Sequence, residues 1–420
     1  MKTKILILLT LLAKFTFAQF QGPIPAITSS YGSDGILPVS VTNLTNDHYS
    51  TIDISIFYPT GTNSPIPTIF YSHAYGGNDT TRQSDLLHHI ASKGYAVVFV
   101  PYKTIGVTIP ERYLTLFDGF VKSAEMLPTI IDTSRIGFYG HSFGGGATPQ
   151  ISYRLFTEKN WGVNGKFIYC SAPWYSFELG STNLDNFPTD CNMLTLLYDN
   201  DETNDHRMGM DIFNNIAIDD SIKDCIIVKS DTISGYIYEA NHNLPTQNFG
   251  NNEFDALDYY VPFRLLDALA DYTFTGNQTA KDIALGNGSS SQTDMGGQLK
   301  ELIITNNPSP IYSETIYQFP CSSATNERQA FCQDIVGIDD RILIKDKINV
   351  YPNPTTGILK ININFEYTTS KVSVYNIVGD RLLLINDNLE LNIQSLPSGT
   401  YYINIMIDNK IEIKKVVKIE

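Results

Sequence analysis

The chain has 420 residues, of which 17% are charged and 12% are aromatic. This composition fits a folded protein rather than a disordered one, and the length suits one large domain with a second, smaller one. The formal net charge of −15 argues against a nucleic-acid partner, because phosphate backbones are bound by clustered lysine and arginine side chains. It also suits a soluble extracellular protein.

The N-terminus has the pattern of a secretory signal peptide. Lys2 and Lys4 form a basic start, and the apolar run that follows, residues 5–13, is short for a transmembrane helix. The small residues near Ala18 predict cleavage after it, so that residues 1–18 would be removed. A membrane anchor is the alternative interpretation. No later apolar stretch is long enough to span a bilayer, so we expect a mature chain without a transmembrane segment.

Strand-like and helical segments alternate downstream of the signal. Residues 52–58 alternate between apolar and polar side chains, which is typical of a strand. Residues 95–100 form a continuous apolar run, which is typical of a strand buried on both faces. Strands that alternate with helices predict a parallel sheet in an α/β fold. The other predicted strands are 68–72, 135–139, 166–171, 193–198 and 235–239, and the predicted helices are 80–93, 113–127 and 254–271.

The pentapeptide Gly140–Gly144 reads GHSFG, a G-x-S-x-G pattern. A predicted strand (135–139) precedes it, and the small residues 144–147 lead from it into a helix. In this setting a sharp turn lifts the hydroxyl of Ser142 above the sheet, and the helix N-terminus directs N–H groups at developing negative charge. The pattern is the nucleophile elbow of α/β-hydrolases. A glycine-rich loop with an incidental serine is the alternative.

A serine nucleophile needs a base, and in α/β-hydrolases the acid and then the histidine follow the serine along the chain. Only His206 and His242 lie downstream of Ser142. His242 is favoured because it follows the strand-like segment 235–239 in a polar loop, where a base at the carboxyl edge of the sheet belongs. The alternative is a plain surface histidine. His141 adjoins Ser142, but we expect its side chain to point elsewhere.

An acidic residue must orient His242 and stabilise its protonated form. The predicted strand 193–198 is followed by the sequence DNDETND. Asp201 is favoured because it lies three residues past the strand end, and Asp199 and Asp205 remain alternatives. The same acidic cluster could bind calcium, but it lacks the glycine and the distal glutamate of a calcium loop.

The oxyanion formed during acyl transfer needs two hydrogen-bond donors. The first is the main-chain N–H of Phe143, the residue after the nucleophile. The second should come from the loop after strand 68–72, where the sequence is SHAYGG. We predict the N–H of Tyr75, with Ala74 as the alternative. An ordinary tight turn is the other interpretation of this loop.

Five short motifs together resemble a known group of enzymes. They are SHAYGG (72–77), GHSFGGG (140–146), SAPW (171–174), YDND (198–201) and NHN (241–243). They are similar to the dienelactone-hydrolase-like and cutinase-like branch of α/β-hydrolases, and most similar to bacterial polyester hydrolases of the cutinase type. The resemblance covers roughly residues 50–245.

The resemblance implies a role for each motif. The roles are nucleophile for Ser142, acid for Asp201, base for His242, oxyanion donor for Tyr75 and substrate-cleft residue for Trp174. Together with Tyr75 and Phe143, Trp174 is expected to form an aromatic-lined cleft suited to hydrophobic or aromatic acyl groups.

The chain departs from this family at several positions. Phe143 replaces the usual methionine, and His141 replaces the usual tryptophan. Pro149 falls inside the helix after the elbow and should bend it. Residues 250–335 have no counterpart that we can place in the family.

The chain has five cysteines, and export would permit disulfides. Cys321 and Cys332 flank a polar loop and form the first predicted pair. Cys191 and Cys225 form a second, weaker one, which leaves Cys170 as a buried strand residue. No spacing of these residues resembles a zinc site, so we expect no metal, and the predicted serine, histidine and aspartate mechanism needs no cofactor.

The sequence changes character near residue 336. Its last part offers short alternating segments separated by turn residues, which predict a small β-sandwich of about 70 residues. The motifs NVYPNPTTGILKI (349–361), VYNIVGD (374–380) and LPSGTYYI (396–403) resemble the C-terminal sorting domain of type IX secretion in Bacteroidetes. This implies passage across the outer membrane by that machinery, followed by tail removal and release or attachment to surface lipopolysaccharide. A carbohydrate-binding sandwich is the alternative, but the tail has almost no pattern of exposed aromatic residues beyond Tyr401 and Tyr402.

These observations predict an α/β-hydrolase catalytic domain (19–335), a linker (336–348) and a sorting domain (349–420). We expect a secreted serine carboxylic-ester hydrolase that acts through an acyl-enzyme on hydrophobic esters or polyesters. The alternatives are a carbohydrate acetyl esterase or peptidase of the same fold, and a non-catalytic surface adhesin on a hydrolase scaffold.

Overall fold

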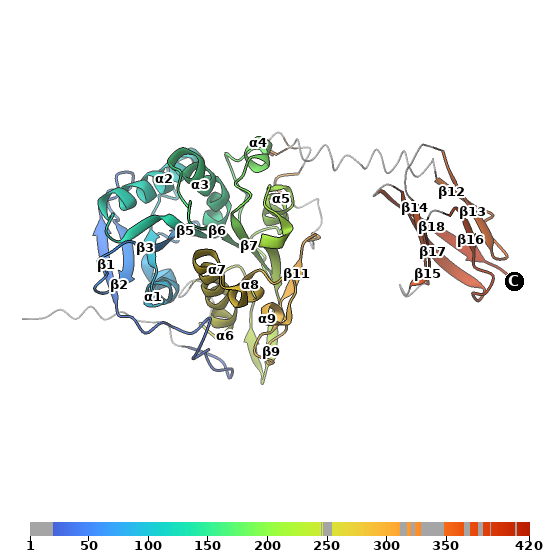
Figure 1. Cartoon of the computed structure of the whole chain (residues 1–420), viewed down its shortest axis with the longest axis horizontal. Helices are drawn as coiled ribbons and strands as arrows, with labels where there is room; N and C mark the ends of the chain where they lie inside the picture. The colour runs from blue at the N-terminus through green and yellow to red at the C-terminus, as the bar shows by residue number, and fades with distance from the viewer. Residues whose placement is uncertain are drawn as a thin grey trace, which may run out of the picture. The chain divides into compact units, whose positions relative to one another are not determined.

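The computed structural model describes residues 20–244, 246, 254–310, 317–320, 323, 325–328, 348–364, 370–376, 381–386, 388–407 and 410–420. The chain divides into a larger unit, residues 1–329, and a smaller one, residues 330–420 (Figure 1). The predicted signal peptide and the predicted boundary near residue 335 lie outside the described residues.

A mixed, mostly parallel sheet forms the centre of the larger unit. In sheet order its strands are β1 (Val39–Leu44), β2 (Ile54–Pro59), β4 (Ala96–Phe99), β3 (Ile66–Ser72), β5 (Ile131–His141), β6 (Lys166–Ser171), β7 (Asn192–Tyr198), β8 (Lys223–Val228) and β11 (Ile303–Thr305). The strands from β4 to β8 run parallel, whereas β1, β2 and β11 pair antiparallel to their neighbours. The carboxyl ends of the parallel strands therefore share one edge of the sheet.

Helices flank both faces of this sheet, which makes the unit an α/β fold (Figure 1). The helices are η1 (Thr80–Gln83), α1 (Ser84–Ser92), α2 (Ile109–Met126), α3 (Phe143–Lys159), α4 (Ser181–Asp185), α5 (Arg207–Asn215), η2 (Asp220–Ile222), α6 (Ala256–Asp258), η3 (Tyr259–Phe263), α7 (Arg264–Thr275), α8 (Gln278–Ala284) and α9 (Ser290–Thr293). The start of α2 shows why the chain turns helical there, because Thr108 and Glu111 form a reciprocal capping box. Helix α3 runs through Pro149 without a break.

Neighbouring side chains of β3 point to opposite faces of the sheet, and each joins the hydrophobic core on its own face. Phe70 packs against Phe120 of α2, with ring centroids 5.0 Å apart. Tyr71 points to the opposite face, where it shares a buried core with Leu87 of α1 and Leu265 of α7. This alternation follows from the two-residue period of a strand, and it places α2 and α1 on opposite faces.

A row of tyrosines crosses three neighbouring strands one or two residues before the strands end. Tyr71, Tyr139 and Tyr169 are partners in register on β3, β5 and β6. Their rings stack at centroid distances of 5.2 and 4.7 Å, and all three side chains are fully buried. Stacked aromatic pairs across strands stabilise one register over its alternatives.

One predicted strand lies elsewhere than expected. Tyr236–Tyr238 (β10) pairs only with Asp231–Ile233 (β9) in a short hairpin and does not belong to the large sheet. The parallel strand at this edge is β8, which the sequence analysis missed. Its first two residues, Lys223 and Asp224, are charged, so the remaining apolar run is too short to indicate a buried strand.

The predicted pair Cys191–Cys225 is wrong. Both cysteines are buried and free, as is Cys170. Cys225 pairs in register with Thr195, so Cys191 lies four residues away along the neighbouring strand, or about 13 Å. A disulfide requires Cα atoms within about 7 Å. The other predicted pair, Cys321–Cys332, lies outside the described residues.

The smaller unit is a β-sandwich. One sheet contains β12 (Ile348–Tyr351), β13 (Ile358–Ile363) and β16 (Glu390–Asn392), and the other contains β15 (Arg381–Asn386), β14 (Ser370–Tyr375), β17 (Gly399–Ile407) and β18 (Lys410–Lys418). Both sheets contribute to one core, which includes Leu359 and Leu391 from the first and Val374 and Ile403 from the second. Tyr401 is buried, and its hydroxyl donates a hydrogen bond to the carbonyl of Pro397 at 2.6 Å.

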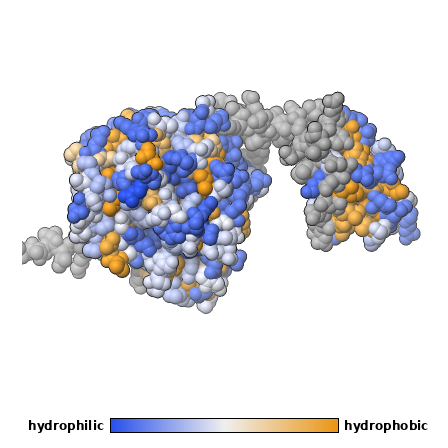
Figure 2. All heavy atoms as spheres, in the orientation of Figure 1, coloured by the Kyte–Doolittle hydropathy of each residue, from blue (hydrophilic) through white to orange (hydrophobic). Residues whose placement is uncertain are grey.

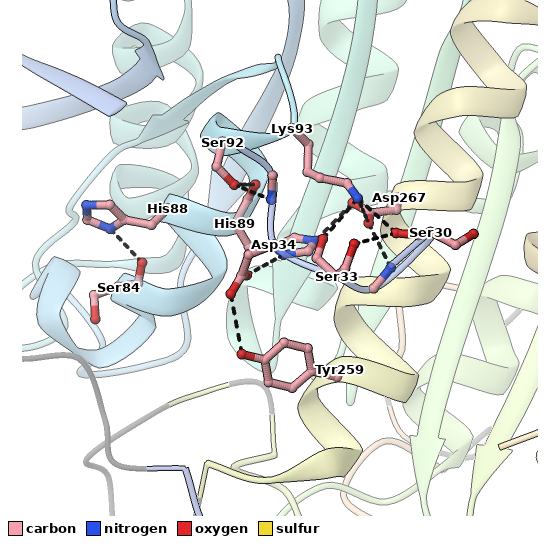
Figure 3. A network of polar contacts seen from close by, with 12 residues as sticks. Ser30, Ser33, Asp34, Ser84, His88, His89, Ser92, Lys93, Tyr259 and Asp267 are labelled. Atoms are coloured by element: carbon pink, nitrogen blue, oxygen red, sulfur yellow. Dashed lines mark hydrogen bonds and ion pairs between the residues drawn. The ribbon is translucent and has the colours of Figure 1, made fainter. Parts of the chain in front are cut away.

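A buried histidine ties the N-terminal segment of the larger unit to two helices (Figure 3). In His89 of α1, Nδ1 lies 3.0 Å from Oδ1 of Asp34 and Nε2 lies 3.0 Å from Oδ1 of Asp267 in α7. Burial by itself lowers the pKa of His89, but the two carboxylates, Asp267 above all, outweigh it and raise the pKa above its ordinary value. Only the protonated ring donates from both nitrogens, so the charged form satisfies both partners.

We expect His89→Gln to destabilise the larger unit by about 2 kcal/mol at acidic pH, because the buried carboxylate of Asp267 loses its charged hydrogen bond from His89 while Nζ of Lys93 stays 3.0 Å from its other oxygen. The stabilisation by charged His89 is complete below the unfolded-state pKa of about 6.5. It is lost as the pH rises through the higher pKa of the folded state, so the difference between wild type and variant should narrow toward alkaline pH. Urea unfolding at several pH values, followed by the fluorescence of Trp161 and Trp174, measures this difference.

The control for this prediction is His48→Gln, which removes a partly exposed pair with Asp118. Its effect on the free energy of unfolding should stay within about 1 kcal/mol. A cost of His89→Gln that is the same at every pH would contradict the assignment of a buried imidazolium.

Candidate active site

Ser142 sits in a strained turn between β5 and α3. Its backbone is in a left-handed region, with φ of 56° and ψ of −119°, which is costly for a residue with a side chain. Two glycines make the turn possible, because main-chain atoms occupy the positions where their Cβ atoms would lie. A Cβ atom on Gly144 would lie 2.0 Å from the carbonyl oxygen of Ser72, and one on Gly140 would lie 2.3 Å from the carbonyl oxygen of Gly144. The sequence therefore forces a tight strand-to-helix turn at the predicted nucleophile.

The structure brings the three predicted residues of the triad together. Nε2 of His242 lies 2.9 Å from the hydroxyl oxygen of Ser142, and Nδ1 lies 2.9 Å from Oδ2 of Asp201. All three side chains are buried. Because a carboxylate only accepts hydrogen bonds, Nδ1 carries the proton and Nε2 presents its lone pair to the hydroxyl. The imidazole is thus oriented to accept a proton from Ser142.

Asp201 is fixed at its other carboxylate oxygen. Oδ1 accepts hydrogen bonds from the main-chain N–H groups of Thr203 and Asn204, at 2.8 and 2.9 Å. These bonds leave Oδ2 to face His242. The turn after β7 therefore holds the acid in one orientation.

The carboxylates of the two alternative acids, Asp199 and Asp205, bind groups other than His242. Oδ1 of Asp199 accepts hydrogen bonds from the N–H and the hydroxyl of Ser230, and Oδ2 lies 3.3 Å from Nζ of Lys229. Oδ2 of Asp205 accepts a hydrogen bond from the guanidinium of Arg207 at 2.6 Å. Within the part of the chain that the structure describes, no three acidic, histidine or cysteine side chains are grouped to hold a metal ion.

His141 has a contact that the sequence analysis did not foresee. Its Nε2 donates a hydrogen bond to the main-chain carbonyl of His242 at 2.7 Å. Burial, with a smaller contribution from the neighbouring His242, lowers the pKa of His141 to about 3, so the ring is neutral in ordinary buffers. The loop of the predicted base is therefore braced by the residue before the predicted nucleophile. A second brace joins this loop to the acid loop, where the N–H of Asn200 donates to the carbonyl of Ala240.

The loop after β3 is held by a second neutral histidine. Nδ1 of His73 donates to the carbonyl of Ala74, and Nε2 accepts from the N–H of Tyr102. Burial lowers the pKa of His73 to about 3. The loop so fixed carries Tyr75, and Phe143 is the first residue of α3. Within the described residues no hydrogen bond uses the main-chain N–H of either one, so both remain available as oxyanion donors.

The side chains of these two residues differ in exposure. Tyr75 is half exposed, whereas Phe143 is buried against Tyr102 and Tyr113. The guanidinium of Arg112 lies between them, 5.2 Å from the ring centre of Tyr75 and 5.3 Å from that of Phe143. The expectation that Phe143 lines an open aromatic cleft is therefore wrong. Its ring packs in the core because a helix that begins at the elbow turns this side chain inward.

Trp174 adjoins the elbow through its backbone. Its N–H donates to the carbonyl of Ser142 at 2.8 Å, and its side chain is partly buried. The amide of Asn204 donates to the carbonyl of Ala172 at 2.7 Å. The loop after β6 is thus attached both to the elbow and to the acid loop. On the face of the larger unit in Figure 2, hydrophobic residues are scattered among polar ones.

Comparison with known proteins identifies the smaller unit. Residues 349–420 match the family model of the secretion system C-terminal sorting domain, which confirms that prediction and its bounds. No curated protein matches the chain significantly. Among the described residues, no helix combines the length and the apolar character needed to cross a bilayer. The smaller unit is therefore a sorting domain, and it directs export of the chain by type IX secretion to the cell surface or the extracellular space.

Proposed function

We propose that the larger unit is a serine ester hydrolase of the α/β-hydrolase fold. The observation that carries this proposal is the continuous hydrogen-bonded series Asp201–His242–Ser142. Support also comes from the strained turn at Ser142 and from the chain order of the three residues, serine before acid before histidine. The position of this series at the carboxyl edge of a mostly parallel sheet agrees with the fold.

The proposed mechanism assigns one step to each group. The hydroxyl oxygen of Ser142 attacks the ester carbonyl while Nε2 of His242 takes its proton, and Asp201 stabilises the imidazolium that forms. The N–H groups of Tyr75 and Phe143 donate to the oxyanion of the tetrahedral intermediate. His242 then gives the proton to the leaving alkoxide, which departs as an alcohol and leaves an acyl-enzyme. Water, deprotonated by His242, attacks the acyl group, and the acid is released when Ser142 recovers its proton.

The surroundings of Ser142 favour an ester with an apolar acyl group. Tyr75 is half exposed and Trp174 is partly exposed, and they lie on the loops after β3 and β6, the strands on either side of β5. Aromatic walls with few polar groups select hydrophobic ligands. We therefore propose hydrophobic carboxylic esters as the substrate class, with polyesters as its polymeric members.

Ser142→Ala should lower kcat for a short-chain aryl ester by about 10⁴-fold or more, because the nucleophile is lost and only binding and oxyanion contacts remain. The same variant should lose labelling by a fluorophosphonate probe. The measurement is a panel of aryl esters, polyester film, acetylated sugars and peptides, with Ser152→Ala, a buried serine farther along α3, as the control. Absence of turnover on every ester, or labelling that persists in Ser142→Ala, would contradict the proposal.

Asp201→Asn should lower kcat by about 10³- to 10⁴-fold, because an amide no longer fixes the imidazole tautomer or stabilises the imidazolium. Asp199→Asn and Asp205→Asn are matched controls, because each replaces another carboxylate of the same loop. Asp199 contacts Ser230 and Asp205 contacts Arg207, rather than His242. Both should retain kcat within about ten-fold of wild type. Loss of activity in Asp199→Asn with activity retained in Asp201→Asn would overturn the acid assignment alone.

A further inference from the structure

The last segment of the larger unit packs against the loop that carries Trp174. We call its described residues, 317–320, 323 and 325–328, the strap. Phe319 stacks on Tyr175 with ring centroids 4.0 Å apart, and its ring meets that of Trp174 edge-on at 6.0 Å. Phe319 is buried whereas Trp174 is partly exposed. The strap therefore contributes to the burial of the indole, which stays partly exposed.

Arg328 anchors the end of the strap. Its side chain is fully buried, and Nε donates to Oδ2 of Asp211 in α5 at 2.5 Å. One terminal nitrogen donates to the carbonyls of Ser176 and Leu179, at 2.6 and 2.8 Å, and the guanidinium lies 4.2 Å from the ring centre of Tyr175. A buried charge is tolerated only where such partners surround it. These contacts therefore attach the strap firmly to the Trp174 loop.

The strap also reaches the acid loop. Gln318 lines a cavity of about 160 Å³ together with Asp201, Asn204 and Asp205. The guanidinium of Arg207, which follows that loop, lies 5.5 Å from the ring centre of Tyr317. The strap is thus in contact with both the acid loop and the loop of the proposed substrate wall.

We propose that the strap is a positioning element of the active site, which holds Trp174 in place for substrate, and that Arg328 belongs to the mature catalytic unit. Any cleavage that releases the sorting tail must then fall after Arg328, because an earlier cut would remove the anchor and free Phe319 from the indole. The role toward substrate rests on the proposed ester hydrolase function, whereas the packing role and the cleavage limit do not.

The packing role is tested in the full-length chain through Trp174. With Trp161→Phe as background, Trp174 is the only tryptophan. Phe319→Ala should raise its acrylamide quenching constant about two-fold, because the buried edge of the indole loses its aromatic cover. Phe274→Ala, which removes a partly buried ring packed between Tyr95 and Phe167, should leave the constant unchanged. An unchanged constant in Phe319→Ala would overturn the proposal.

Kinetics separate positioning from a purely structural role. Phe319→Ala should raise KM for aryl esters about 5-fold or more while kcat per labelled site changes little, because the substrate wall moves and the triad does not. A fall in fluorophosphonate-labelled enzyme with KM unchanged would show that the strap only stabilises the fold. If the wild type turns over no ester while the quenching constant still rises in Phe319→Ala, the proposed function fails and the packing role stands.

The cleavage limit is tested by mass spectrometry of the protein that a type IX-secreting host exports. The C-terminal peptide of the exported protein should end after Arg328, because the anchor has to stay on the catalytic unit. A mature C-terminus before Arg328 in protein that still labels with fluorophosphonate would overturn this part of the proposal.

Discussion

The left-handed backbone at Ser142 is the constraint on which the rest of the proposed site depends. Such a conformation costs about 1–3 kcal/mol, and the surrounding structure must hold it in place. Gly144 supplies that hold by packing closely against the carbonyl of Ser72, the residue that begins the loop of the proposed oxyanion donor Tyr75. The proposed nucleophile and the loop with the proposed second oxyanion donor are therefore positioned by one backbone contact, in which no side chain larger than hydrogen fits.

The elements nearest this turn could be predicted from the sequence because their signals are local. A G-x-S-x-G pattern between an apolar strand and small residues specifies the turn by its own glycines. The placement of Asp201 and His242 required only the chain order of an α/β-hydrolase and the ends of two predicted segments. The structure brings both to Ser142, although the segment before His242 proved to be a hairpin outside the large sheet.

What could not be predicted depends on partners far away in the sequence. The sequence favoured Asp201 but left Asp199 open, and Asp199 is excluded only by its contacts with Ser230 and Lys229. His141 gave no signal of its own, because its partner is a main-chain carbonyl 101 residues away. The pairing of Cys191 with Cys225 failed for the same reason, since strand register rather than sequence spacing sets their separation.

The tyrosine row across β3, β5 and β6 has a consequence for how this protein can diversify. Tyr71, Tyr139 and Tyr169 lock the three strands at one level, and the oxyanion loop, the elbow and the Trp174 loop all start just beyond it. The loops that follow these tyrosines can therefore change in length and composition without shifting the strands that the tyrosines hold in register. The substrate range of the proposed hydrolase can therefore be altered in evolution or by design through the Trp174 loop and its strap, while the platform that carries the proposed nucleophile stays the same.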